Sequence, residues 1–329
     1  MFHGLKIFIF SLLVSIIFKI VEVYLGIENG FHPDSLYYVD NYYLFTLNGF
    51  LSFGTFNNLY YFIVEWLAAN EIALIFLNQI AFAITNILLA RQFKYDFKTF
   101  TFIKIFVLFL PYRLHLSAHV LKDTLIILSI FATISLPIAK LPVALILTSL
   151  MRLVAGPATL LVRFFPIGRV YFISFIFIFI SAVALSPALF EALSDRGNVD
   201  MIGRDYFAVP LSNTTSINLI FIKSLFWPIL AKTGGYIAFA ISPIVVVLAL
   251  EPLIFLAWAY YERSVTRYLT SNGTLVMILF SVLVTNYGAY YRYIYGFMIL
   301  DYVIIISTIA NFQKPQKKDV RIKKRYFRI

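Results

Sequence analysis

The amino-acid sequence predicts an all-α, polytopic integral membrane protein. Of its 329 residues, 61% are hydrophobic and only 13% are charged, and the mean hydropathy is +0.87. Soluble domains hold about 45–50% apolar and about 25% charged residues. Long apolar runs recur along almost the whole chain, and "ISPIVVVLALEPLIFLAWAY" is an example. Because such runs approach the ~20 residues that cross a bilayer as a helix, they favour helices over the short alternating strands of a barrel.

We expect about nine or ten membrane segments. The first run, 5–25, lacks a small-residue cleavage site and is therefore expected to remain as an anchor. The further apolar runs are 72–90, 102–110, 124–138, 171–189, 237–259, 275–287 and 294–310.

The stretch 141–165 is expected to form a broken, re-entrant pair of helices. The basic segments "RQFKYDFK" and "RFFPIGR" both look cytoplasmic, yet three apolar segments lie between them. Because two segments on the same side require an even number of crossings, one apolar segment must enter and leave on one side. Gly156-Pro157 is the predicted interruption, with Arg152 near it, since such breaks are tolerated where backbone lines a cavity.

Charge sets the expected orientation. Residues 20–90 contain six carboxylates and no Lys or Arg, whereas residues 314–328 contain eight basic residues and one acidic residue. Basic residues stay on the cytoplasmic side, so both termini are expected there. The chain then divides into a membrane domain, 1–312, and a basic cytoplasmic tail, 313–329. The tail is interpreted as a topological anchor, and no nucleic-acid partner is expected.

Three outer loops follow from this orientation: 26–71, 111–123 and 190–235. The last is expected to be a partly helical flap on the membrane. The first contains "NGFHPDSLYYVDNYY", and the second is "PYRLHLSAHVLKD". The outer loops, an arginine inside an apolar run and an arginine at the outer end of the last helix supply the candidate site, in the absence of a phosphate-binding loop or any other soluble-enzyme signature. The candidates are His32, Asp34, Asp40, Tyr37, Tyr38, Arg113, Lys122, Asp123, Arg152, Tyr291 and Arg292.

Each candidate also has an ordinary explanation. Asp34 and Asp123 stand where they could cap a following helix, and the tyrosines suit an interfacial aromatic belt. Arg152 is harder to explain in this way, because an arginine within an apolar run costs about 2.5–3.5 kcal/mol on insertion scales.

His115 and His119, four residues apart, resemble half of a metal site. With no third ligand in sequence nearby, no metal is expected. Glu22 has Lys19, three residues earlier, as its expected partner.

The residue types together suit the transfer of a sugar from a lipid-linked phosphate. Aromatic faces stack on sugar rings, arginine forks bind phosphate oxygens, and a carboxylate or histidine can accept the proton of an acceptor hydroxyl. The sugar acceptor and the phosphate would meet at the outer surface, where the lipid tail enters from the bilayer.

The order of four motifs resembles bacterial O-antigen and capsule polymerases and related membrane glycosyltransferases of the GT-C type. These motifs are "HPDSLYYVDNYY", "LPYRLHLSAHVLKDTLIIL", "LTSLMRLVAG" and "YYRYIYGFMILDYVIII". The resemblance implies polymerisation of undecaprenyl-diphosphate-linked oligosaccharide units at the outer face of the inner membrane, without metal or other cofactor. It also implies the lipid bilayer and other polysaccharide-assembly membrane proteins as partners.

The resemblance also assigns roles. Arg152 and Arg292, with Arg113 and Lys122, would hold the diphosphate, and Asp34 would activate the acceptor hydroxyl, with His32 or Asp40 in reserve. Two departures leave the donor open between a mono- and a diphosphate. The outer loop 190–235 has only two arginines near its start, and the acidic cluster after the first helix leans toward enzymes that use polyprenyl-monophosphate sugars. A single-sugar GT-C transferase and a transporter or flippase of lipid-linked sugars are the alternatives.

Overall fold

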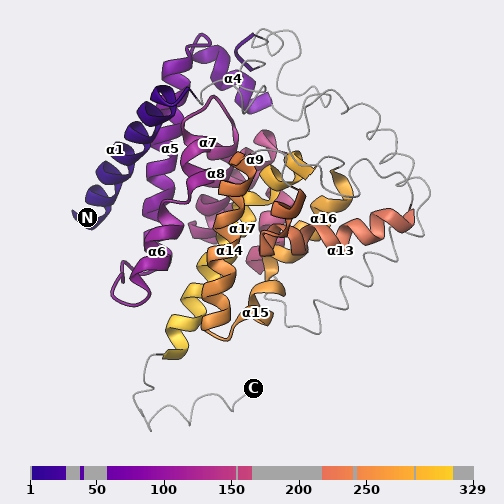
Figure 1. Ribbon diagram of the computed structural model, residues 1–329. Coiled ribbons are helices and arrows are strands. Elements are labelled where there is room, and N and C mark those ends of the chain that lie inside the picture. Colours follow the sequence, from indigo (N-terminus) through magenta and orange to yellow (C-terminus); the bar gives the residue numbers. More distant parts are fainter. Residues whose placement is uncertain are drawn as a thin grey trace.

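The computed structural model describes residues 2–26, 38–40, 58–152, 155–164, 217–239, 243–284 and 287–313. Within these ranges the regular structure is helical and no strand occurs, which confirms the all-α class. Figure 1 shows the helices gathered into one bundle, with α1 along one side and α17 running through the middle. The tail that follows residue 313, the run 171–189 and most of the loops 26–71 and 190–235 lie outside the described residues.

The helices follow the predicted apolar runs closely. They are α1 (Phe2–Tyr24), α4 (Asn58–Trp66), α5 (Glu71–Gln92), α6 (Thr101–Leu108), α7 (Pro111–Ser117), α8 (Asp123–Ser135), η1 (Ile138–Lys140), α9 (Leu141–Met151), α10 (Ala155–Phe164), α13 (Ile217–Thr233), η2 (Gly235–Phe239), α14 (Pro243–Tyr261), α15 (Val265–Leu269), α16 (Asn272–Leu283) and α17 (Tyr287–Gln313).

Three of the described helices are long and apolar enough to cross a membrane: residues His3–Tyr24, Glu71–Gln92 and Tyr287–Ala310. The outward face of α1 carries large apolar side chains such as Leu13 and Ile17, which are more than half exposed. Such a surface suits lipid, because soluble proteins rarely expose large contiguous apolar patches. The membrane character therefore has support from three helices, and the full number of crossings stays a prediction.

Two opposite ends of the bundle can be defined along α5. Near its start, the Asn78 amide donates to the carbonyls of His119 and Leu121 at 2.7 and 2.9 Å. At its last residue, the Gln92 amide donates to Ser135 Oγ at the end of α8, at 3.2 Å. The fourteen residues between Asn78 and Gln92 span roughly 21 Å of helix. Helices α5 and α8 therefore run in the same direction, from an Asp123 end to the opposite end.

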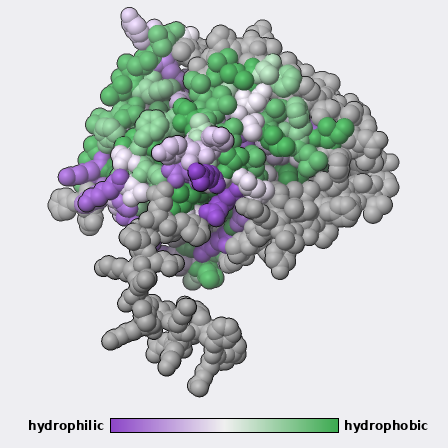
Figure 2. All heavy atoms as spheres, turned by 60° about the horizontal axis from the view of Figure 1, so that its bottom comes forward, coloured by the Kyte–Doolittle hydropathy of each residue, from purple (hydrophilic) through white to green (hydrophobic). Residues whose placement is uncertain are grey.

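The opposite end carries exposed basic residues and is called the basic end. It comprises Arg91 in the last turn of α5, Lys94 and Lys98 after this helix, and Arg263 and Arg267 around α15. Figure 2 shows hydrophilic residues gathered on this face, with hydrophobic residues on the flank above it. The start of α1 lies here too, since the His3 ring contacts the Tyr95 ring with centroids 6.4 Å apart. The arrangement agrees with a cytoplasmic position for "RQFKYDFK".

The broken helix pair forms, but the break differs from the prediction. Helix α9 ends at Met151, Arg152 is extended at φ −158° and ψ 108°, and α10 begins at Ala155. Gly156-Pro157 is thus the first turn of α10 and not the interruption, because proline is tolerated in the first turn of a helix, where its missing N–H costs nothing. The helices pack against each other. Their eleven and ten residues give each about half of the ~30 Å bilayer core.

Parts of the expected loops are helical. Residues 111–123 contain α7, because "PYRLHLS" begins with a proline suited to a first helical turn. The residues of this helix from Tyr112 to Ser117 are buried. Helix α4 lies within 26–71, and α13 lies at the end of 190–235. Helix α13 packs along α16 and buries Trp227, so this part of the expected flap belongs to the bundle.

Candidate functional site

Four charged side chains converge at the Asp123 end of the bundle. Arg152 Nη2 donates to Asp123 Oδ1 at 2.7 Å. Arg292 Nε lies 3.5 Å from Asp123 Oδ2. Lys122 is the adjacent residue and is buried like Asp123. Three cations and one carboxylate thus meet where the start of α8, the α9–α10 break and the first turns of α17 come together. We call these four residues the Asp123 cluster.

Local structure explains how Arg152 reaches this place. The helix ends one residue earlier, so the extended backbone of Arg152 directs its side chain away from the α9 axis. Its guanidinium lies over the Tyr293 ring, 3.8 Å from the centroid, and this cation–π contact fixes the plane of the fork. The residue is 6% exposed. An arginine buried this deeply requires partners, and Asp123 and Tyr293 supply them.

Aromatic rings cover the lysine. Lys122 Nζ lies 5.9 Å from the centroid of the Tyr38 ring, and Tyr38 packs edge-on against Tyr60 and Tyr61 of α4. The pKa of Tyr60 is raised above its ordinary value, mainly by burial and to a smaller extent by the nearby Asp123 carboxylate. Its phenol therefore keeps its proton and remains a hydrogen-bond donor.

Arg152 Nε and the Tyr60 hydroxyl are buried donors at the cluster that have no hydrogen-bond acceptor among the described residues. Buried donors are nearly always paired, so their position beside Asp123 indicates a site that accepts hydrogen-bonding oxygens from elsewhere. Phosphate and sugar oxygens are acceptors of this kind.

The cap interpretation of Asp123 is wrong. Asp123 is the first residue of α8, Lys122 occupies the cap position, and no side chain caps this helix. The Asp123 carboxylate accepts instead from Arg152, because a charged donor forms the stronger hydrogen bond.

The other sequence-predicted residues lie apart from the cluster or outside the described residues. Arg113 packs over the Phe82 ring at 4.3 Å and donates to the Asn86 side chain of α5. Tyr291 packs among buried rings. Asp40 is exposed on a short helical segment. The candidates outside the described residues are His32, Asp34 and Tyr37.

The sequence analysis did not identify two aromatic residues that lie beside the Asp123 cluster, Tyr60 and Tyr293. Tyr293 stands next to Arg292 in "YYRYIYG", and a ring beside an arginine is a usable signal. Tyr60 carries no such signal, because α4 meets α9 only in the folded chain.

A second polar cluster lies near the Asp123 end, between α1 and α7. Glu22 Oε1 lies 2.5 Å from His115 Nδ1, and Glu22 Oε2 lies 3.2 Å from His119 Nε2. Carboxylate and imidazole are metal-ligating groups. These three residues are the metal-ligating set found within the described residues.

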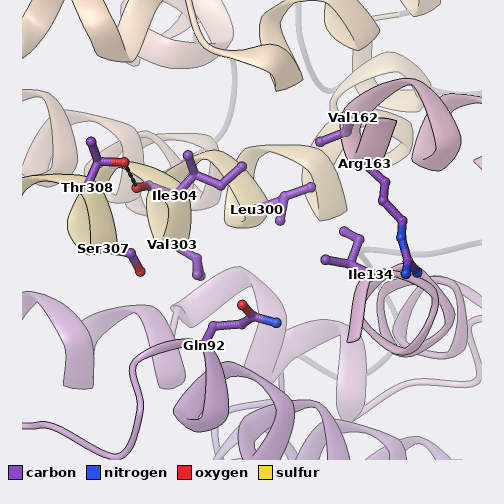
Figure 3. Close-up of a pocket in the computed structure, with 9 residues that line it drawn as sticks. All are labelled: Gln92, Ile134, Val162, Arg163, Leu300, Val303, Ile304, Ser307 and Thr308. Carbon is purple, nitrogen blue, oxygen red and sulfur yellow. Dashed lines mark hydrogen bonds between the residues drawn. The ribbon is translucent and has the colours of Figure 1, made fainter. Parts of the chain in front are cut away.

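A cavity of about 430 Å³ lies at the basic end, away from Asp123. Figure 3 shows Gln92 facing the Ser307 side of α17, with Arg163 reaching toward the end of α8. Arg163 donates to the carbonyls of Thr133 and Leu136. This arginine therefore caps the last turn of α8, which is a structural role.

Comparisons with models of protein families, with curated proteins and with solved structures found no match to this chain.

Proposed function

We propose that this protein is a membrane glycosyltransferase that joins undecaprenyl-diphosphate-linked oligosaccharide units into O-antigen or capsule polysaccharide. The observation that carries the proposal is the Asp123 cluster. It places two guanidinium groups and an ammonium group around one carboxylate, beside buried donors that can receive phosphate oxygens. A diphosphate suits this set because arginine forks bind phosphate oxygens in two parallel hydrogen bonds.

The cluster also lies where a lipid carrier could present its headgroup. It is at the end of the bundle opposite the basic residues, and the half-length helices α9 and α10 meet beside it. A polyprenyl tail would remain in the bilayer while the diphosphate approaches Arg152. Apolar side chains such as Val143 and Ile146 on the exposed face of α9 suit contact with such a tail.

In the proposed reaction, the acceptor hydroxyl of one lipid-linked unit attacks the anomeric carbon of the growing chain. A new C–O bond forms as the bond from that carbon to the carrier phosphate breaks. Undecaprenyl diphosphate leaves with the bonding electron pair, and the hydroxyl proton passes to a base. Asp34 is the first candidate for this base, with His32 and Asp40 as the others. The Asp123 cluster would stabilise the charge on the leaving diphosphate.

The first test replaces Arg152 and Arg292, one at a time, in the chromosomal copy of the gene. Arg152→Ala and Arg292→Ala are expected to abolish the polysaccharide ladder on a gel while the protein still inserts, because the leaving diphosphate loses its cationic partners. Arg152→Lys should restore only part of the ladder, since lysine keeps the charge but not the fork. Arg263→Ala, at the basic end, is the control and should leave the ladder unchanged.

The same gel separates the alternatives. A single unjoined unit in the gene-deleted cell supports polymerisation. A truncated unit would instead indicate a transferase that adds one sugar from a polyprenyl-phosphate donor. Export of labelled finished units by vesicles that contain only this protein would instead indicate a flippase. A full ladder in both arginine variants would exclude the diphosphate role of the Asp123 cluster.

A further inference from the structure

We propose that Glu22, His115 and His119 bind one divalent transition-metal ion, with Zn²⁺ as the preferred ion. The site joins α1 to α7 and to the turn that follows it. It stands apart from the proposed glycan chemistry, and its role is to hold the first helix on the bundle.

The donor set is the first argument. Two imidazoles and one carboxylate form a ligand set that zinc uses in proteins, with metal–nitrogen distances of about 2.0–2.1 Å and metal–oxygen distances of about 2.0–2.2 Å. In a tetrahedral site these bond lengths place neighbouring ligand atoms about 3.3 Å apart. The His119 Nε2 to Glu22 Oε2 distance is 3.2 Å, and one ligand atom from each of the three residues lies within 4.8 Å of the other two.

Convergence from two distant parts of the chain is the second argument. His115 lies in α7 and His119 in the turn after it, and their ring centroids are 4.4 Å apart. Glu22 comes from the last turns of α1, 93 residues before His115. One imidazole would be enough to form a hydrogen bond with the Glu22 carboxylate, yet two imidazoles face it. A doubly charged cation would hold all three groups at once.

Burial is the third argument. Glu22, His115 and His119 are 4%, 7% and 5% exposed. A carboxylate and two imidazoles removed from water require strong mutual partners, and metal coordination is one of the two usual solutions. The backbone around His119 is also held in place, because the Asn78 amide donates to its carbonyl at 2.7 Å. A pre-positioned backbone of this kind lowers the cost of closing a metal site.

The function of the ion follows from the position of α1. This helix exposes most of its large apolar side chains, and its buried polar residues Ser11, Ser15 and Glu22 contact the bundle. A bound ion near its last turn would fix α1 against the segment that leads to Lys122 and Asp123. Its loss would therefore loosen the first helix without removing a group from the Asp123 cluster.

Metal content of the purified protein is the test. The chain is prepared in detergent without a polyhistidine tag, stripped with a chelator, loaded with Zn²⁺ and desalted, and its zinc is measured by mass spectrometry. About one ion per chain is expected. Glu22→Gln, His115→Asn and His119→Asn should each lose it. His3→Asn removes an exposed histidine that is not one of the three proposed ligands, and this variant should keep the zinc ion.

A second measurement uses the unchanged chain, so that it does not depend on the folding of the variants. Co²⁺ replaces Zn²⁺, and the intense visible bands of four-coordinate cobalt are expected at one equivalent. A weak octahedral spectrum, zinc below stoichiometry in the unchanged chain, or zinc retained by all three cluster variants would each overturn the site. None of these results depends on the polysaccharide gel.

Discussion

Two buried ion pairs of similar geometry differ in how completely they are satisfied. Lys232 Nζ lies 2.6 Å from Asp301 Oδ2 and also donates to the Tyr268 carbonyl at 2.7 Å. The second Asp301 oxygen accepts from the Gly273 N–H at 2.9 Å. The Asp123 cluster, in contrast, leaves buried donors without described acceptors. We therefore interpret the Lys232–Asp301 pair as structural and the Asp123 cluster, with its unpaired donors, as a ligand site.

The structural pair predicts a specific pattern of stability. Asp301→Ala should lower the free energy of unfolding by about 3–5 kcal/mol, because it leaves the Lys232 ammonium buried without its counter-ion. The double variant Lys232→Met with Asp301→Leu should recover most of the loss. Reversible unfolding in mixed detergent micelles measures both. Equal losses in the single and double variants would contradict the assignment.

At the scale of elements, α1 is attached by a polar stripe. Ser15 Oγ lies 2.7 Å from Ser117 Oγ of α7, and the Asn86 amide of α5 donates to Ser11 Oγ at 2.8 Å. Ser11, Ser15 and Glu22 lie on one face of α1, since they are separated by four and seven residues. Lipid is as apolar as the outer face of α1, so association depends on packing and on such hydrogen bonds.

Removal of one contact in this stripe should have a modest cost. Ser15→Ala is expected to lower the free energy of unfolding by about 0.6 kcal/mol and at most about 1.7 kcal/mol, the range measured for hydrogen bonds between membrane helices. Ser129→Ala is the matched control, because Ser129 Oγ donates to the Ile126 carbonyl of its own helix. The same micelle unfolding assay applies, and a greater loss in Ser129→Ala than in Ser15→Ala would refute the role of the stripe.

Sequence patterns predicted the helices far better than their junctions. The apolar runs of α1, α5 and α17 exceed the length of any soluble strand, so composition alone identified them. The break at Arg152 was misplaced by a few residues, because proline at a helix start and proline at a helix end look alike in one sequence.

Long-range contacts set a similar limit on the site. The sequence marks Asp123, Arg152 and Arg292 as members of three separate candidate groups, and the structure brings them together. Glu22 was matched with Lys19 because that residue is near in sequence, yet it contacts His115 and His119. No periodicity in one chain encodes a partner 93 residues away.

At the scale of the whole molecule, the basic end defines an orientation. The start of α1 and the turn after α5 lie together at this end. The end of α17 also lies there, since Ala310 lines a small pocket with Phe93 and Lys104. The Asp123 cluster lies near the other end of α5. We expect from the positive-inside rule that the cluster lies toward the outer side of the membrane.

This orientation can be tested cleanly because the chain has no cysteine. Lys98→Cys, at the basic end, should react with a membrane-impermeant maleimide only after the cells are permeabilised. Tyr24→Cys, at the end of α1, replaces a side chain that is 88% exposed and should react in intact cells. The unchanged chain provides the blank. Labelling of Lys98→Cys in intact cells would reverse the orientation.

The separation of the two arginines along the chain has a consequence for biosynthesis. Asp123 and Arg152 emerge from the ribosome within one short stretch and can pair at once. Arg292 follows 140 residues later, which corresponds to about 7–28 s at ordinary rates of synthesis. The nascent protein thus spends that interval with a two-membered ion pair, and only the arrival of α17 completes the cluster. A ribosome stalled before residue 292 would hold a chain whose Asp123 cluster lacks Arg292, so any function of that cluster begins only after this part of α17 has been made.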